Sequence, residues 1–353
     1  MYREIGSLPN SQRRLCIIAA PNHKWRFETM LGSVLLVITG LALLIWGADR
    51  FVHGAAATAR NLGVAPLLIG LTVVAFATSA PEILVSVLAS LRGQPGLAFG
   101  NAIGSNIVNI GLVLGCVAII RPIQMRSATV RREMPALLAV TLLTVALFLD
   151  AYLSRIDGLV LLTGLGIVLI WLARIGIRSA PTDPMQGEFD AEIPKDVRMS
   201  RAVFWLTVGL AALLLGAHLL VKGSISIAEY FHVSDVVIGI LLVALGTSLP
   251  ELAVSLVSAL RGEYGLAIGN IVGSNIFNLL GVVGVAAVIA PIGVQQTVLS
   301  LHIFVMVAFT LVLFAMTYDY DGKSELSRLE GFALLAAFVA YDVYVGLQNV
   351  RIH

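Results

Sequence analysis

Two short segments place hydroxyl groups, a proline and a glutamate inside long apolar runs. The segments read Thr78-Ser79-Ala80-Pro81-Glu82 and Thr247-Ser248-Leu249-Pro250-Glu251. An ionisable side chain in the middle of an apolar run is costly in lipid unless it is paired, neutralised or hydrated, which makes each glutamate a candidate functional residue. A protonated glutamate bonded to a neighbouring helix is the simpler interpretation, but it does not account for two glutamates in matching surroundings.

Each proline releases a backbone carbonyl near its glutamate. Pro81 and Pro250 have no N–H to donate, and each pushes away the carbonyl four residues earlier, at Ala77 and at Gly246. Freed carbonyls, Thr and Ser hydroxyls and one carboxylate from each segment would together form a cage of oxygen atoms. Calcium accepts about six to eight oxygen ligands in irregular geometry, whereas magnesium keeps its waters and zinc prefers His or Cys, which both segments lack. The pattern therefore favours Ca²⁺, whose charge two carboxylates would balance.

A second motif also occurs twice. Residues 100–109 read GNAIGSNIVN and residues 269–278 read GNIVGSNIFN. In each copy a Ser and the final Asn are four residues apart and so share one helix face, which pairs Ser105 with Asn109 and Ser274 with Asn278. We expect these side chains to line the same cage. For the glycines of the motif we expect close helix packing instead.

The four motifs belong to two copies of one larger unit. A shift of 169 residues places Gly70–Gly115 over Gly239–Gly284 without a gap, and 24 of the 46 positions are identical. The same register extends outward to Gly47 over Gly216 and to Pro122 over Pro291. Two repeats with a shared site where broken helices meet are a recurrent plan of secondary transporters.

Composition places these repeats in a membrane. Of 353 residues 58% are apolar and only 12% are charged, against roughly 25% charged in a soluble domain. Hydropathy suggests ten spans, at about 31–58, 66–92, 97–120, 134–150, 157–178, 202–228, 235–260, 266–290, 297–317 and 328–348. Because each half would hold five spans, an odd number, the second half enters from the opposite side. We predict an all-α integral membrane protein with ten transmembrane helices in two inverted five-helix repeats.

The chain divides at a polar middle. We expect an N-terminal extension at 1–29, a first repeat at 30–178, a connector at 179–201 and a second repeat at 202–353. Most Lys and Arg after Met30 fall on the connector's side of the membrane, whereas the other side holds only Arg92, Arg155, Lys222 and Arg351. Positive charge near spans marks the cytoplasmic face, so the connector should be cytoplasmic and the C-terminus outside. The cationic segment 1–29 weakens this bias, and we expect Met30 to be the true start.

Several other classes of protein find no support in the sequence. The net charge of +2 and the scattered Lys and Arg argue against nucleic-acid binding. Cys16 and Cys116 stand apart, without the spacing of a disulfide framework or a zinc site. A nucleotide loop, a nucleophile–base pair and an HExxH motif are all absent, so we expect no enzyme and no cofactor. A channel would need a continuous pore, which one central site argues against. The lipid bilayer and the transported ions are the expected partners, with no obligate protein partner.

The two motif pairs resemble the signatures of the cation/calcium exchanger superfamily, G-T-S-x-P-E and G-S-N-x-x-[ND]. The chain most resembles the bacterial inner-membrane calcium/sodium antiporters, from Met30 to the C-terminus. The resemblance implies that the second, third, seventh and eighth spans enclose the ions while the first and sixth slide over them. It also implies twelve ligand positions, six in each repeat: Ala75, Thr78, Ser79, Glu82, Ser105, Asn109, Ala244, Thr247, Ser248, Glu251, Ser274 and Asn278.

Two positions depart from the family pattern. Ala77 stands where Gly is common, which we interpret as a mild packing change. Asn278 stands where many sodium-coupled members have Asp, and it offers one carbonyl oxygen but no titratable charge. The sequence thus predicts a multi-pass antiporter of the bacterial inner membrane that exchanges Ca²⁺ for Na⁺. The alternative is Ca²⁺/H⁺ exchange, because two buried glutamates could take up protons when Ca²⁺ leaves.

Overall fold

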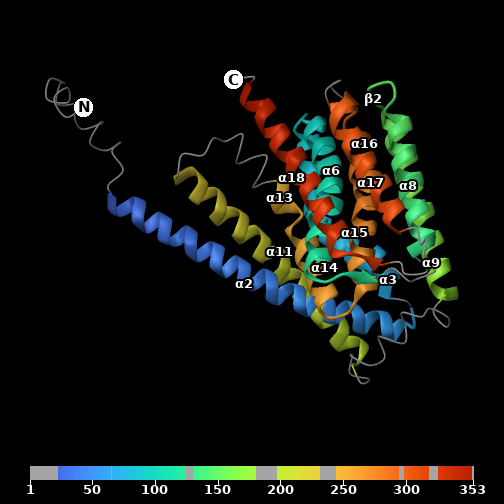
Figure 1. Cartoon of the computed structure of the whole chain (residues 1–353), viewed down its shortest axis with the longest axis horizontal. Helices are drawn as coiled ribbons and strands as arrows, with labels where there is room; N and C mark the ends of the chain where they lie inside the picture. Colours follow the sequence, from blue (N-terminus) through green and yellow to red (C-terminus); the bar gives the residue numbers. More distant parts are fainter. Residues whose placement is uncertain are drawn as a thin grey trace.

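A computed structural model describes residues 23–64, 66–124, 130–179, 197–230, 244–293, 298–317 and 325–351 of the chain. Almost all of these residues are helical (Figure 1). Six helical stretches are long and apolar enough to cross a membrane: Met30–Leu62, Pro95–Ile120, Arg155–Leu172, Met199–Ile227, Tyr264–Ile289 and Arg328–Leu347. A bent pair of helices could make a seventh span, and three shorter apolar helices run from Glu133 to Leu147, Leu249 to Leu260 and Leu301 to Thr317. The prediction of an all-helical, multi-pass membrane protein is confirmed, whereas the count of ten spans stays a prediction.

Two of the long stretches form the centre of the molecule. The first comprises α6 (Pro95–Val108), η3 (Asn109–Leu114) and α7 (Gly115–Ile120), and the second comprises α15 (Tyr264–Ile276), η5 (Phe277–Val282) and α16 (Val283–Ile289). In their most apolar windows 72% and 89% of the residues are buried, against 17–22% in the other four stretches. Because those four expose most of their apolar surface, they are the ones suited to contact lipid. Both central stretches carry the Gly-Ser-Asn motif.

The helix that precedes each central stretch is broken beside its glutamate. In the first half, α3 (Pro66–Ile69), η2 (Gly70–Val74) and α4 (Ala75–Thr78) end at Ser79, and α5 (Ala80–Leu91) continues at an angle of 50°. In the second half, α13 (Ala244–Thr247) ends at Ser248 and α14 (Leu249–Leu260) follows. The proline lies in the first turn of the new helix, where its missing N–H costs nothing. Residues 235–243 of the predicted seventh span lie outside the described residues.

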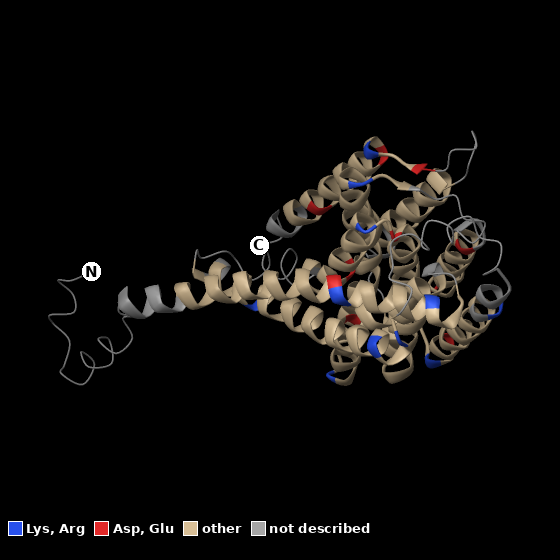
Figure 2. Cartoon of the chain, turned by 90° about the horizontal axis from the view of Figure 1, so that it is seen from below, with Lys and Arg blue, Asp and Glu red and all other residues tan. Residues whose placement is uncertain are grey.

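A long antiparallel pair of helices lies beside this centre and extends beyond it (Figure 1). The pair consists of α2 (His23–Leu62) and α11 (Met199–Tyr230). Gly47 approaches the backbone of Leu213 so closely that a Cβ atom would lie 2.5 Å from its nitrogen, and Gly216 meets Leu44 at the same distance. Such close approach of backbones requires residues without side chains. Where Figure 2 colours the extending length by residue type, few charged residues lie on it, as a lipid-facing surface requires.

The outer helices cross between the halves. Helix α9 (Arg155–Ser179) packs on α16, and α18 (Arg328–Arg351) packs on α7. Two antiparallel strand pairs also connect one half to the other. Strand β1 (Ile123–Gln124) pairs with β4 (Glu325–Leu326), and β2 (Tyr152–Leu153) pairs with β3 (Ile292–Gly293). Helices α8 (Val130–Leu147) and α17 (Phe304–Thr317), the latter preceded by η6 (Val298–Ile303), also pack together. Each half is therefore completed by the last helix of the other.

The element boundaries follow the predicted spans closely, with a few differences. Helix α2 begins at His23, inside the segment assigned to the N-terminal extension. Four two-residue strands join the helices, and the sequence did not predict them. The π-helical turns η2, η3, η5 and η6 were also not predicted. Residues 1–22 and most of the expected connector, 180–196, lie outside the described residues.

Candidate functional site

The segment that precedes the break at Ser79 packs directly against helix α15 of the second half. A Cβ atom added to Gly273 would lie 2.6 Å from both the Ala75 Cβ and the Leu71 carbonyl oxygen, so α15 touches η2 and α4 directly. Gly70 meets Leu266 and Gly269 in the same way. The repeated glycines therefore bring the first TSAPE segment to the motif helix of the other repeat. The expected close packing holds for Gly269 and Gly273, whereas a Cβ atom added to Gly100 or Gly104 would meet no described atom within 4 Å.

Glu251 is held by hydroxyl groups from both halves. Its side chain is 1% exposed. Ser79 Oγ donates to Glu251 Oε1 over 3.2 Å, and Ser274 Oγ lies 3.5 Å from the same oxygen. A buried carboxylate is tolerated only when such donors or a cation compensate the loss of water. The other carboxylate oxygen, Oε2, is buried without a hydrogen bond in the described part of the chain.

Glu82 occupies the matching position with fewer donors. It is also 1% exposed, and neither of its carboxylate oxygens makes a hydrogen bond of good geometry within the described part of the chain. The Thr247 side chain lies beside this carboxyl group, and Glu251 is close enough to repel it electrostatically. Two buried carboxylates that repel each other create a strong demand for a cation between them.

The site contains six buried oxygen atoms without hydrogen bonds among the described residues. All six come from positions in the predicted ligand set, three from each half: Glu82 Oε1, Glu82 Oε2, Asn109 Oδ1, Ser248 Oγ, Glu251 Oε2 and Asn278 Oδ1. Buried polar atoms in native proteins are almost always hydrogen-bonded, so a group of exceptions requires an explanation. A bound cation with oxygen ligands satisfies all of them, and calcium takes about six to eight such ligands.

Asn270 connects the two broken helices. Its Oδ1 accepts a 3.0 Å hydrogen bond from Thr78 Oγ1 in the other half. Its Nδ2 donates to the Glu251 carbonyl oxygen over 3.3 Å and to Ser255 Oγ over 2.9 Å. The sequence motif contains Asn270, but reasoning from the sequence did not assign it a role. The signal was the identical Asn101 in the first repeat, whose Nδ2 lies 3.5 Å from the Glu82 carbonyl oxygen.

Four asparagines join the two central helices at the middle of the site. Asn106 Nδ2 donates to the Asn275 carbonyl oxygen over 3.3 Å, and Asn278 Nδ2 donates to Asn106 Oδ1 over 3.1 Å. Asn109 Nδ2 donates to Asn275 Oδ1 over 3.1 Å. Asn106 and Asn275 were not among the predicted ligands. Both central helices change to π-helical turns here, at Asn109 and at Phe277.

Most of the other predicted ligands are also buried. Ala75, Ser105 and Ser248 are buried, and Thr247 is half-buried. Ala244 begins α13, but its side chain lies outside the described part. No group of three or more His, Cys, Asp and Glu side chains suited to a metal occurs among the described residues. The candidate site therefore has two carboxylates, with hydroxyl and amide oxygens near them.

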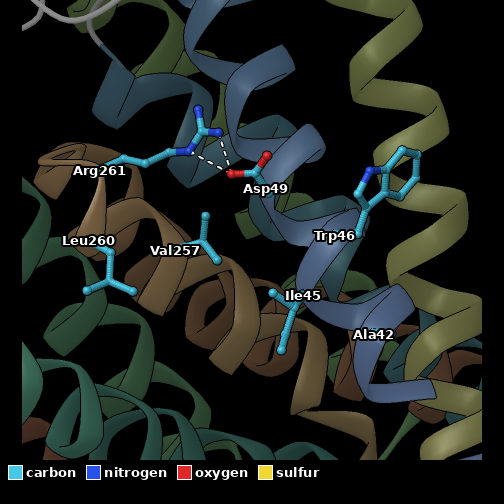
Figure 3. A pocket seen from close by; sticks show the side chains of 7 residues that line it. All are labelled: Ala42, Ile45, Trp46, Asp49, Val257, Leu260 and Arg261. Atoms are coloured by element: carbon cyan, nitrogen blue, oxygen red, sulfur yellow. Dashed lines mark hydrogen bonds and ion pairs between the residues drawn. The ribbon is translucent and has the colours of Figure 1, made fainter. Parts of the chain in front are cut away.

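A second polar feature lies between α2 and α14, away from this site. Arg261 donates from both Nε and Nη2 to Asp49 Oδ1, with the Nε bond at 3.1 Å (Figure 3). The pair borders a cavity of about 490 Å³ whose other walls are apolar. The guanidinium of Arg50 lies 5.0 Å from the centroid of the Trp205 ring on α11. These contacts tie the α2–α11 pair to the end of α14.

Comparison with known proteins places the chain in a family. Residues 32–174 and 201–347 match the family described as sodium/calcium exchanger protein. The chain is 46% identical over 313 residues to a protein named as the antiporter CaxA of Alkalimonas amylolytica, covering 89% of this chain and 98% of that one. It is 38% identical to the inner membrane protein YrbG of Escherichia coli, over 88% of this chain and 96% of the relative.

A solved structure supports the same assignment. The structure of the sodium–calcium exchanger NCX_Mj, soaked without Na⁺ and Ca²⁺, superposes with a TM-score of 0.76 and 36% sequence identity. The match covers 89% of this chain and 98% of the exchanger. The likeness therefore includes both repeats and the helices that cross between them.

Proposed function

The chain belongs to the sodium/calcium exchanger protein family, and we propose that it exchanges Ca²⁺ for Na⁺ across the bacterial inner membrane through one site built from both repeats. The family is one of exchangers rather than enzymes. The observation that carries the proposal is the set of six buried oxygens without hydrogen bonds among the described residues, three from each half. Their number and chemical type match the ligands of a hard cation.

Charge explains why the site would favour Ca²⁺ and still release it. The carboxylates of Glu82 and Glu251 balance one divalent charge, so a calcium ion removes the repulsion between them. Monovalent cations in the same oxygen cage would have to be present in greater number for equal compensation. Sodium ions arriving from one side would then displace calcium, and the two ions would compete for one set of ligands.

We infer ten membrane spans in two inverted repeats. The repeat-related helices α2 and α11 are antiparallel, as inversion requires. The strand that follows one central helix pairs with the strand from the opposite half in both cases. The two broken helices, α3–α5 and α13–α14, together with α8 and α17, would supply the four spans beyond the six long ones. By the distribution of Lys and Arg, the connector is cytoplasmic and the C-terminus is outside.

The packing also suggests which parts move. The glycine contacts join α2 to α11 so closely that the two helices would shift as one body. The candidate ligands lie on the other elements, from α4 to η3 in the first half and from α13 to η5 in the second. Displacement of the α2–α11 pair would then expose the site to one side of the membrane at a time, without rearranging the ligands.

The proposal is tested by calcium-45 uptake into proteoliposomes that contain the purified protein. Uptake is compared under an outward Na⁺ gradient, an outward proton gradient and no gradient. We expect uptake under the Na⁺ gradient alone. Uptake under the proton gradient alone would establish Ca²⁺/H⁺ exchange instead, and would point to Asn278, which lacks the carboxylate of many sodium-coupled relatives. Absence of uptake under every gradient would contradict calcium transport.

A further inference from the structure

We propose that Asn106 is a positioning residue for ion binding, which holds the side-chain amide of Asn278 so that Asn278 Oδ1 stays available as a ligand. The inference rests on the proposed function, since it concerns the same ion site. Asn106 is 2% exposed and lies on α6, whereas Asn278 lies on η5 of the other half. Their contact therefore joins the two repeats at the site.

A backbone carbonyl fixes the orientation of Asn106. Its side chain lies 3.3 Å from the carbonyl oxygen of Asn275, which can only accept a hydrogen bond. The group of Asn106 that faces Asn275 must therefore be the amino group, Nδ2. The oxygen, Oδ1, is left to face Asn278.

The orientation of Asn278 follows from that of Asn106. The Asn278 atom 3.1 Å from Asn106 Oδ1 has to be a donor, and the only donor on this side chain is Nδ2. Rotation of the Asn278 amide by half a turn would bring two oxygens together. The three groups thus hold the Asn278 amide in one orientation.

The fixed amide presents an oxygen that no other described group uses. Asn278 is 1% exposed, and its Oδ1 has no hydrogen bond among the described residues. A buried carbonyl oxygen without a partner is costly, whereas a cation at that oxygen would compensate the cost. A carboxylate at position 278 could not donate to Asn106, so the amide gives this chain a neutral ligand that Asn106 can orient.

The matching pair in the other half is less constrained. Asn275 Oδ1 accepts from Asn109 Nδ2 over 3.1 Å, but Asn275 Nδ2 is buried without a hydrogen bond in the described part. Within that part, no backbone carbonyl anchors the Asn275 amide as one anchors Asn106. The firm positioning is therefore a property of the Asn106–Asn278 pair.

Two isosteric variants separate positioning from packing. Asn106→Asp keeps an acceptor for Asn278 Nδ2, whereas Asn106→Leu keeps the number and branching of the side-chain heavy atoms and removes the acceptor. We expect calcium binding to the purified protein, measured by isothermal titration in Na⁺-free buffer, to be roughly tenfold weaker in the Leu variant than in the Asp variant. If Asn106 only filled space, the apolar Leu would be tolerated at least as well as a buried carboxyl group, and that result would overturn the inference. If the Leu variant does not fold, Asn106→Ala removes the same acceptor.

The same two variants, made in protein that also carries Asn278→Ala, control for the charge that Asn106→Asp adds. In the Asn278→Ala variant, Asn106 has no amide to orient, so the difference between Leu and Asp at position 106 should fall below about threefold. A difference that stays near tenfold would show that the carboxylate introduced by Asn106→Asp acts through its charge alone, and it would refute positioning. If the unaltered protein does not bind calcium, the proposed function itself fails. If it binds calcium and the Leu and Asp variants behave alike, only the present inference fails.

Discussion

Ser79 of the first repeat donates a hydrogen bond of 3.2 Å to Glu251 of the second. The two residues are 172 positions apart in the chain, and both are buried, Ser79 at the break of its helix and Glu251 in the first turn after the matching break. Because one half supplies the donor and the other the carboxylate, the electrostatics of the site depend on correct docking of the repeats. The four-asparagine network and the Thr78–Asn270 hydrogen bond likewise join a donor in one half to an acceptor in the other.

Replacement of Ser79 tests this docking. Ser79→Ala should weaken calcium binding by roughly tenfold, because it removes a hydrogen bond to a charged group. Isothermal titration in Na⁺-free buffer measures the change. Ser86→Ala is the matched control on the following turns of the same span, since Ser86 Oγ makes only two long contacts of 3.5 Å, with the Ala98 carbonyl oxygen and with Asn101 Nδ2. Equal losses in the two variants would contradict a specific role of Ser79.

Neutralisation of Glu82 should stabilise the ion-free protein. Its carboxylate lacks hydrogen bonds within the described residues and lies near Glu251, so an uncharged amide of the same shape costs less to bury. We expect Glu82→Gln to unfold at a higher temperature than the unaltered protein without calcium, and to lose the stabilisation that added calcium provides. Glu251→Gln should gain less, because Ser79 already donates to its carboxylate. Thermal unfolding in detergent, with and without calcium, measures both effects. A lower unfolding temperature for Glu82→Gln in ion-free buffer would contradict the account.

The α2–α11 contact makes a prediction about glycine. In Gly47→Ala the new Cβ would lie 2.5 Å from the Leu213 nitrogen, and the helices would have to separate at a cost of about 1–3 kcal/mol. In Gly32→Ala, on the same helix, the Cβ would meet no described atom within 4 Å, and stability should rise by up to about 1 kcal/mol through helix propensity. The unfolding temperatures of the two variants should therefore change in opposite directions. A similar small change in both would show that the close approach is unimportant.

The Asp49–Arg261 ion pair should matter more for transport than for stability. Both side chains are more than a third exposed, at 37% and 36%, so the pair should contribute less than about 1 kcal/mol to folding. It nevertheless connects α2 to α14, two helices that the proposed motion separates. We expect Asp49→Asn and Arg261→Gln to alter the rate of calcium uptake in the same direction, and the double variant to add little to either. Additive effects of the two changes would exclude a shared contact.

The sequence indicated the candidate site segments because they occur twice. The shift of 169 residues relates Glu82 to Glu251 and Asn109 to Asn278, and helical spacing indicates which members of one segment share a face. Neither the shift nor the helical spacing can indicate which repeat supplies the residues that a given side chain contacts. The contacts of Ser79 with Glu251 and of Asn106 with Asn278 therefore required the structure. The Asp49–Arg261 pair escaped prediction for the same reason, since surface charges carry no repeat signal.

Local geometry was predictable where a residue type enforces it. Pro81 and Pro250 indicated the breaks, and the structure has a new helix beginning beside each of them. The π-helical turns at Asn109 and Phe277 have no comparable residue signature. They arise where the central helices meet across the halves, so tertiary packing determines them. The short strand pairs depend in the same way on the outer helices that cross between the repeats.

The most direct test of the central claim is calcium-45 uptake under an outward Na⁺ gradient by proteoliposomes containing Glu82→Gln, Glu251→Gln or Asp342→Asn protein. Asp342 lies on α18, outside the candidate site, and serves as the control carboxylate. We expect either glutamate change to abolish uptake and Asp342→Asn to leave it nearly unaltered. Calcium uptake that persists in either glutamate variant would contradict a site shared by the two repeats.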